Sequence, residues 1–159
     1  MEQLSLSRWL KSITIGIGII GIIVYLLITP SWGYDLLRNS IDMSGWYWPW
    51  LVFIWITAIP CYMSLFEFWK ICCEVGRDNS FSRENARSLK RISQLLIITS
   101  IIVFIGNVVL FLLKMNHPSI AIIMVFVMFG GIAVAVFAAT LSHLILKASK
   151  MREENELTI

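Results

Sequence analysis

Few residues of this chain belong to the types that catalyse reactions or bind metal ions. The sequence has three cysteines and two histidines. Cys72 and Cys73 are adjacent and lack the spacing of a structural zinc site, and His117 and His143 are expected on opposite faces of a membrane. No serine, cysteine or threonine has a base and an orienting acid that the sequence places beside it. We therefore expect a protein that is not an enzyme, with no catalytic residue, metal site or cofactor.

One motif has the form of a nucleotide site. Residues 16–21 read GIGIIG, which matches the dinucleotide-binding pattern G-x-G-x-x-G, and Asp42 follows at about the expected distance. That pattern binds phosphate only at a turn from a strand into a helix, whereas these glycines lie inside a long apolar run. We interpret them as small residues that let helices approach closely. Gly131, Ala135 and Ala139 predict a second such face, and both faces would lie within the helix bundle or in a homodimer.

Long apolar runs are the elements that must position all other residues. The 159 residues are 58% hydrophobic and 14% charged, far from the roughly 25% charged residues of soluble domains. In lipid, backbone polar groups must be paired within helices or a closed barrel, and continuous apolar runs favour helices. About 20 residues are needed for each span. The sequence predicts one all-α domain, a four-helix transmembrane bundle with spans at about residues 12–29, 46–66, 94–113 and 119–146.

The basic residues predict the orientation of these spans. Lys and Arg are enriched on the cytoplasmic side of a membrane, and eleven of the thirteen lie before the first span, between the second and third, or after the fourth. The first span is long for a signal peptide and lacks a small-residue cleavage site, so we interpret it as a retained helix. We expect a multi-pass protein of the inner (plasma) membrane with cytoplasmic N- and C-termini, a cytoplasmic loop at residues 67–93 and a cytoplasmic tail at residues 147–159.

Ionisable residues are absent from the middle of every predicted span, which argues against a proton path through the membrane. Glu67 and His143 lie at similar depth near the cytoplasmic ends of their helices, and we expect them to form an interfacial polar pair. Cys72 and Cys73 follow the second span directly, where cysteines are common sites of acylation. Acylated and simply reduced side chains are both compatible with the sequence.

The cytoplasmic loop contains a helix start followed by basic residues. Asn79, Ser80 or Ser82 can cap a helix that has Glu84 in its first turn, and Phe81 would be an apolar anchor at its entry. The basic residues that follow recur every four positions, with a lysine beside them, and share one helical face: Arg83, Arg87, Arg91 and Lys90. This basic stripe predicts binding to anionic lipid, to a cytoplasmic partner, or to both.

The C-terminal tail is polar although the chain before it is apolar. The fourth apolar run is longer than a membrane requires, so it predicts a tilted helix or one that extends into the cytoplasm. Glu153, Glu154 and Glu156 could engage the basic stripe. The apolar Leu157 and Ile159 could then fill a groove in this protein or in a partner, and a solvated, frayed terminus is the alternative.

The loop and the tail also contain motifs that resemble those of a known family. The loop has the form NSF-x-x-x-NA-x-x-LK-x-I, and the tail ends in A-x-x-x-x-EE-x-ELTI. With four spans and both ends inside, the chain resembles the YoaS-like family of small four-helix bacterial membrane proteins, a domain-of-unknown-function family. The matching positions are Phe81, Asn85, Leu89, Ile92, Ala148, Glu153, Glu154, Glu156, Leu157, Thr158 and Ile159.

The resemblance implies a regulatory role rather than an activity, since no activity is assigned to the family. Its members are often encoded beside a small helix-turn-helix regulator, which implies a non-enzymatic membrane protein that binds or sequesters this regulator without binding nucleic acid itself. A small transporter, and a membrane immunity or stress-tolerance protein, are alternatives. The residues expected to bind the partner or lipid are Phe81, Arg83, Asn85, Arg87, Lys90, Arg91, Glu153, Glu154, Glu156, Leu157, Thr158 and Ile159.

Overall fold

The computed structural model describes residues 2–38, 47–114 and 118–156, and these residues are helical except for the turns at 76–82 and 113–114. The elements are α1 (Glu2–Ile23), the π-helical η1 (Val24–Ile28), α2 (Thr29–Arg38), α3 (Tyr47–Val75), α4 (Arg83–Leu112) and α5 (Pro118–Glu156). Four stretches are long and apolar enough to cross a membrane: Leu4–Asp35, Tyr47–Val75, Arg83–Leu112 and Pro118–Asn155. The predicted all-α protein with four candidate spans is confirmed.

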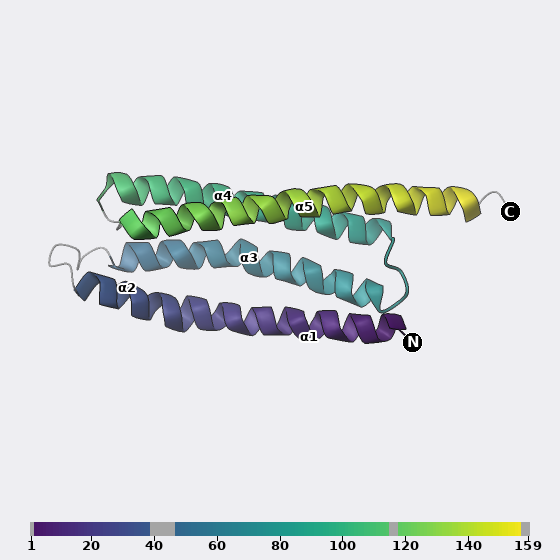
Figure 1. The fold of residues 1–159 in the computed structure, drawn as a ribbon, viewed down its shortest axis with the longest axis horizontal. Coiled ribbons are helices and arrows are strands. Elements are labelled where there is room, and N and C mark those ends of the chain that lie inside the picture. Colours follow the sequence, from purple (N-terminus) through teal and green to yellow (C-terminus); the bar gives the residue numbers. More distant parts are fainter. Residues whose placement is uncertain (1, 39–46, 115–117, 157–159) are drawn as a thin grey trace.

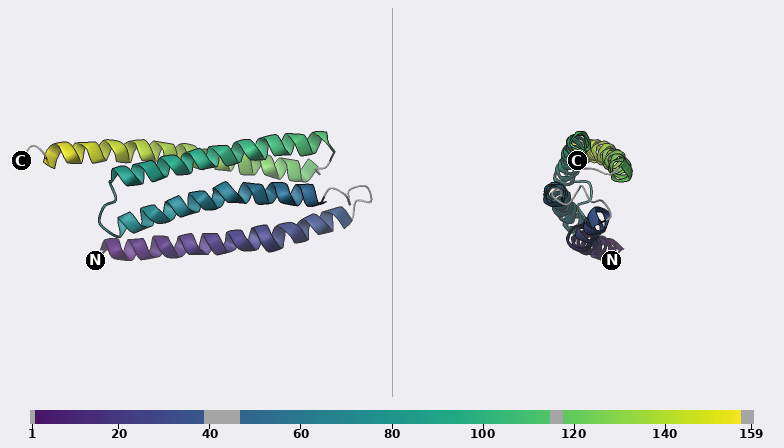
Figure 2. Two further views of the ribbon diagram at one scale, coloured as in Figure 1. Left: turned by 180° about the vertical axis from the view of Figure 1, so that it is seen from behind. Right: turned by 90° about the vertical axis from the view of Figure 1, so that its left-hand side faces the viewer.

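The four long helices form an open, curved row. Neighbours along the chain pack against each other, α1 on α3, α3 on α4 and α4 on α5, whereas the described parts of α1 and α5 make no close contact. The end-on view in Figure 2 shows the row as an arc. The predicted bundle is therefore corrected to an open arrangement. Such a row is stable in lipid because apolar helix faces that meet acyl chains need no protein partner.

Both ends of the described chain lie at one end of the row. Figure 1 shows the start of α1, the turn at residues 76–82 and the end of α5 on the same side, which we call the loop end. α5 has 39 residues and α4 has 30, so its last turns extend past the other helices (Figure 1). The expected extension of the fourth apolar run beyond its span is thus present.

Small and polar side chains make the contact between α4 and α5. The Oγ of Ser142 on α5 donates a hydrogen bond to the backbone oxygen of Ala86 on α4 at 2.6 Å. Toward the opposite end, the Nδ2 of Asn107 donates to the backbone oxygen of Ala121 at 3.1 Å. Hydrogen bonds of this kind hold transmembrane helices together where no hydrophobic driving force exists between them.

The small-residue face predicted for α5 is confirmed in its first half. A side chain on Gly131 would meet Ser100 on α4 at 2.9 Å, and Ala135 is fully buried. Ala139 is exposed, and Ala138 is buried in its place. The strict four-residue spacing was wrong because antiparallel helices in long contact require an average repeat of about 3.5 residues.

The glycines of the GIGIIG motif pack α1 against α3. Tyr62 donates its hydroxyl to the backbone oxygen of Gly18 at 3.0 Å. A side chain on Gly21 would lie 2.7 Å from the Tyr62 hydroxyl, and one on Gly18 would lie 3.3 Å from Leu65. Gly16 has no neighbour within 4 Å. The interpretation of this motif as a packing surface is therefore confirmed for two of its three glycines.

Candidate functional site

A buried carboxylate joins α3 to α4 near the loop end. Glu67 on α3 is 8% exposed. Its Oε1 accepts hydrogen bonds from Lys70 at 2.7 Å and Arg91 at 3.3 Å, and its Oε2 accepts one from the Ser88 hydroxyl at 2.9 Å. Because a buried charge is costly unless it is paired and hydrogen-bonded, these three donors are what allows a carboxylate here. We call these four residues the Glu67 cluster.

The predicted pairing of Glu67 with His143 is wrong. His143 is exposed on α5, and the described part of α5 does not contact α3. In the open row α4 lies between these two helices, so a residue of α4 reaches the carboxylate first. The sequence signal for the true partners was present, since Ser88 and Arg91 are three residues apart and share a face of α4.

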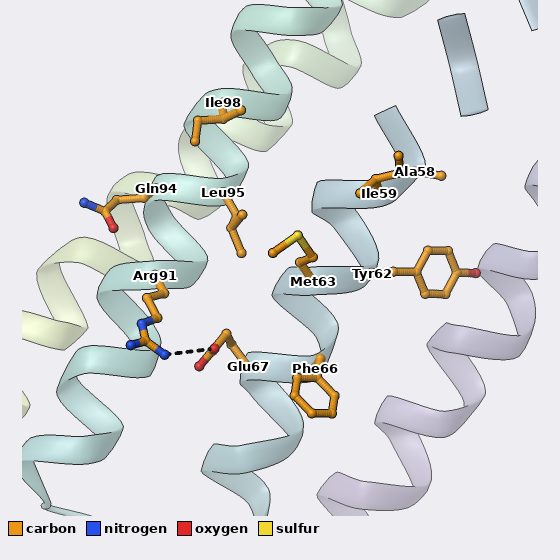
Figure 3. Close-up of a pocket in the computed structure, with 10 residues that line it drawn as sticks. All are labelled: Ala58, Ile59, Tyr62, Met63, Phe66, Glu67, Arg91, Gln94, Leu95 and Ile98. Atoms are coloured by element: carbon orange, nitrogen blue, oxygen red, sulfur yellow. Dashed lines mark hydrogen bonds and ion pairs between the residues drawn. The ribbon is translucent and has the colours of Figure 1, made fainter. Parts of the chain in front are cut away.

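An apolar groove between α3 and α4 begins at the Glu67 cluster. It has a volume of about 840 Å³. Figure 3 shows the ion pair between Arg91 and Glu67 at one end of the groove, with Gln94 beside it. The remaining side chains that line it are mostly apolar: Ala58, Ile59, Tyr62, Met63, Phe66, Leu95 and Ile98. The groove is therefore amphipathic along its length, with charge confined to the loop end.

A smaller polar pocket continues from the groove. It has a volume of about 390 Å³ and shares Arg91 with the groove as a wall. Its other lining residues are mainly polar or charged: Trp69, Lys70, Cys73, Glu74, Glu84, Asn85, Arg87 and Ser88. Lys70, Ser88 and Arg91 thus face both Glu67 and the polar pocket, which makes the Glu67 cluster the boundary between an apolar and a polar space.

The loop motif closes the turn between α3 and α4. The Ser82 hydroxyl accepts a hydrogen bond from the backbone N–H of Asn85 at 3.1 Å, so Ser82 is the N-cap among the three candidates. The side-chain nitrogen of Asn85 donates to the backbone oxygens of Asn79 and Ser80 at 3.2 Å and 2.9 Å. Asn85 is 2% exposed. The expectation that Asn85 contacts a partner is corrected, because its buried side chain is hydrogen-bonded inside the turn.

The basic stripe divides into residues with different roles. Arg91 is bonded to Glu67, and Arg83 forms an ion pair with Glu153 on α5. Arg87 and Lys90 are exposed. Phe81 is also exposed, at 58%, so it does not serve as a buried anchor for the helix start. Arg83 and Arg91 are exposed as well but are held by these ion pairs, so the exposed residues of the predicted loop and stripe surface outside the two pairs are Phe81, Arg87 and Lys90.

The ion pair of Arg83 and Glu153 joins the first turn of α4 to the last turns of α5. Ser149, one turn before Glu153, is 4% exposed, so this part of α5 also packs against its neighbour. The predicted engagement of the tail with the stripe is present at Glu153. Glu154 lies at an exposed position of α5. Glu156 is the last residue of α5. Leu157, Thr158 and Ile159 lie outside the described residues, so their docking stays a prediction.

The two loop-end cysteines differ in access. Cys72 is fully buried, and its thiol lies 3.7 Å from the hydroxyl of Thr14 on α1. Cys73 is partly exposed. Acylation of Cys72 would require α1 and α3 to separate, so this alternative is restricted to Cys73. In residues 2–38, 47–114 and 118–156, no three potential metal ligands gather in one place.

A second cavity lies at the opposite end, where the arc of helices is hollow. It has a volume of about 700 Å³ and takes its walls from η1, α2, α3, α4 and α5. Its polar wall residues include Asp35 and Thr57, and the rest of its lining is largely apolar. Trp50, also in its wall, has an indole N–H that is buried without a partner among the described residues. Sequence reasoning missed this cavity because it depends on how four helices curve.

The fold defines a helical protein with four segments able to span a membrane. Residues 35–159 match the family described as "Protein of unknown function (DUF2975)", and the chain belongs to this family. It is 30% identical over 152 residues, 92% of each of the two chains, to "Uncharacterized membrane protein YoaS" of Bacillus subtilis (strain 168). The resemblance expected from the loop and tail motifs is therefore confirmed. No solved structure matches the chain.

Proposed function

We propose that the protein is a non-enzymatic regulatory membrane protein whose loop end lies in the cytoplasm and docks a small helix-turn-helix transcription regulator. The main supporting observation is that the last turns of α5 extend past the other helices (Figure 1) and are held to α4 by the ion pair of Arg83 and Glu153. An ordered helix that leaves the apolar part of the row has little use in anchoring, and it offers a fixed surface to a partner.

The residues exposed beside this helix suit a protein interface. Phe81 is two residues from Arg83, and its ring is 58% exposed at the turn. Arg87 and Lys90 follow it on α4 and are exposed as well. Aromatic and arginine side chains supply much of the binding energy at protein interfaces. This Phe81 surface therefore supports docking independently of the tail.

The acidic residues at the end of α5 are compatible with a DNA-binding partner, although Lys147, Lys150 and Arg152 precede them and Glu153 is also paired with Arg83. Glu153, Glu154 and Glu156 put three carboxylates into four consecutive positions. A surface that binds DNA is basic because it must neutralise phosphates, so the same surface of a regulator would be attracted to these carboxylates. A regulator held in this way would be kept from its operator, which would couple the state of the membrane protein to transcription.

Affinity capture from native membranes tests this function. The full-length chain is compared with a chain that lacks residues 153–159 and with Phe81→Ala, while Tyr34→Ala removes an equally exposed aromatic ring at the opposite end (62% exposed). We expect the wild type and Tyr34→Ala to retain a small helix-turn-helix regulator, and the other two variants to retain about tenfold less. Retention of no such regulator, or equal retention by the truncated chain, would contradict the proposal.

Transport is a second candidate, favoured by the burial of Glu67 at the end of an open groove. An ionisable residue buried in a membrane helix is a candidate for proton or ion coupling. In vesicles containing the purified protein, gradient-driven uptake that disappears in Glu67→Gln would support this candidate. Uptake equal to that of protein-free vesicles would remove it.

A further inference from the structure

The groove between α3 and α4 is apolar along most of its length and charged at one end, as a phospholipid is. Most of its wall is apolar, and its charged groups, Glu67 and Arg91, are at the loop end (Figure 3). Its volume of about 840 Å³ lies within the range of about 300–1,000 Å³ typical of small-molecule sites. A transmembrane groove with such a wall meets acyl chains on its open side. The nature of the head group then depends on the charges at the loop end.

The charges of the Glu67 cluster do not cancel. Lys70 and Arg91 supply two positive charges and Glu67 one negative charge. The carboxylate side chain is only 11% exposed, whereas Arg91 is 62% and Lys70 is 44% exposed. Arg91 and Glu67 line the groove and Lys70 lines the adjoining polar pocket, so a molecule at this end meets a net charge of +1 in which the two cations are more exposed than the carboxylate. The surface presented at this end of the groove is positive.

Both cations keep hydrogen-bond donors available. A guanidinium has five N–H donors and an ammonium has three. Within the described part of the chain, Arg91 and Lys70 each donate one hydrogen bond, and both go to Glu67 Oε1. The carboxylate holds the two cations near each other, which prepares them for an anion with several acceptor oxygens. A phosphate diester fits this arrangement because its oxygens accept charge-assisted hydrogen bonds.

The polar pocket beyond the cluster does not reverse this charge. It adds Arg87 and the carboxylates of Glu74 and Glu84. Glu74 is already bonded by Arg77 at 3.2 Å and by Asn79 at 3.0 Å. Arg87 balances the exposed Glu84, so the excess positive charge remains at Lys70 and Arg91. The polar pocket is an aqueous neighbour of the head-group position.

We propose that this groove binds one anionic phospholipid, with an acyl chain along the apolar wall and the phosphate at Arg91 and Lys70. This site is distinct from the general attraction of basic residues to an anionic membrane, because it pairs a shaped groove with two oriented cations. Basic pockets between transmembrane helices on the cytoplasmic side are known to suit lipid head groups. The bound lipid would bridge α3 and α4 at the position where Glu67 also joins them.

Lipid titration of the delipidated, full-length protein tests the site. Phosphatidylglycerol and phosphatidylcholine with the same acyl chains are added in detergent, and bound lipid is counted by native mass spectrometry. We expect one phosphatidylglycerol per chain at roughly tenfold lower concentration than phosphatidylcholine, because Arg91 and Lys70 favour the anionic head group. Arg91→Gln should remove most of this preference. Arg8→Gln, which changes an exposed arginine on α1 outside both the groove and the polar pocket, should preserve it.

A second pair of variants tests the acyl-chain groove and leaves the charges unchanged. Ile98→Trp fills the groove, while Ile105→Trp places the same ring two turns further along α4 at a similarly exposed position outside it. We expect Ile98→Trp to weaken the binding of both lipids and Ile105→Trp to leave the binding of both unchanged. Equal affinity of the wild type for the two lipids, equal effects of Arg91→Gln and Arg8→Gln, or full binding by Ile98→Trp would each overturn the proposal. Competition by free glycerol phosphate as strong as that of the lipid would also overturn it.

Discussion

The side-chain amide of Asn85 donates a hydrogen bond to the backbone oxygen of Ser80 at 2.9 Å, across the turn between α3 and α4. The same nitrogen reaches the backbone oxygen of Asn79 at 3.2 Å. Asn85 is therefore the residue that gives the NSF-x-x-x-NA motif a structural meaning, because it fixes the turn that displays Phe81. The motif specifies the shape of a surface, and the exposed members of the motif are the ones available to a partner.

Replacing Asn85 should loosen this turn. Asn85→Ala leaves two backbone oxygens without their donor, and an unsatisfied buried group costs about 1–3 kcal/mol. We expect faster hydrogen exchange in the amides of residues 79–86 and a lower unfolding temperature in detergent. Asn155→Ala, at an exposed position of α5, is the matched control and should change neither. Unchanged exchange in Asn85→Ala would show that the turn is held by other contacts.

Replacing two glycines inside helices by alanine should change the stability of the protein in opposite directions. A side chain on Gly106 of α4 would overlap the ring of Phe53 on α3, whereas one on Gly130 of α5 meets nothing within 4 Å. Gly106→Ala should therefore lower the stability by about 1–3 kcal/mol, the usual cost of overpacking. Gly130→Ala should raise it, since Ala favours a helix by up to about 1 kcal/mol over Gly. Thermal unfolding in one detergent compares the two variants directly, and equal shifts would contradict the close packing of α3 on α4.

The ion pair of Arg83 and Glu153 should keep the end of α5 packed against α4 but contribute little to the overall stability of the protein. Both side chains are about half exposed, at 51% and 49%, and exposed pairs contribute roughly 0.2–1 kcal/mol. Arg83→Glu or Glu153→Arg alone should speed tryptic cleavage after Lys150 and Arg152. The double exchange should restore resistance because the opposite charges meet again. A double variant as sensitive as either single one would mean that the pair does not hold α5.

The cysteines should differ in their reaction with thiol reagents. Cys72 is fully buried between α1 and α3 and Cys73 is partly exposed. In chains that retain one of the two and lack Cys61, a water-soluble maleimide should label Cys73 at least about tenfold faster, because thiol reactivity requires access. Mass spectrometry of the intact chain measures this, and the denatured proteins provide the control. Equal labelling in the folded proteins would mean that α1 does not cover Cys72.

The sequence by itself determined the features that depend on local chemistry. Four apolar runs had to become helices because lipid leaves backbone groups no other partners, and four candidate spans are present. Ser82 was among the residues able to cap α4 because a hydroxyl before a helical run accepts a free N–H, and it is the cap. Gly18 and Gly21 predicted a close helix contact for the same local reason, their lack of side chains. The orientation of the spans follows from the basic residues alone and stays a prediction.

Only the tertiary structure decided which of these helices face each other. The pairing of Glu67 with Arg91 and Ser88, and its separation from His143, follow from the order of helices in an open row. The groove between α3 and α4 and the cavity at the opposite end exist for the same reason. Helix periodicity shows which face of a helix is small or polar, but apolar faces that meet lipid and apolar faces that meet protein have the same composition. That equivalence is the physical reason why the spans could be predicted and their arrangement could not.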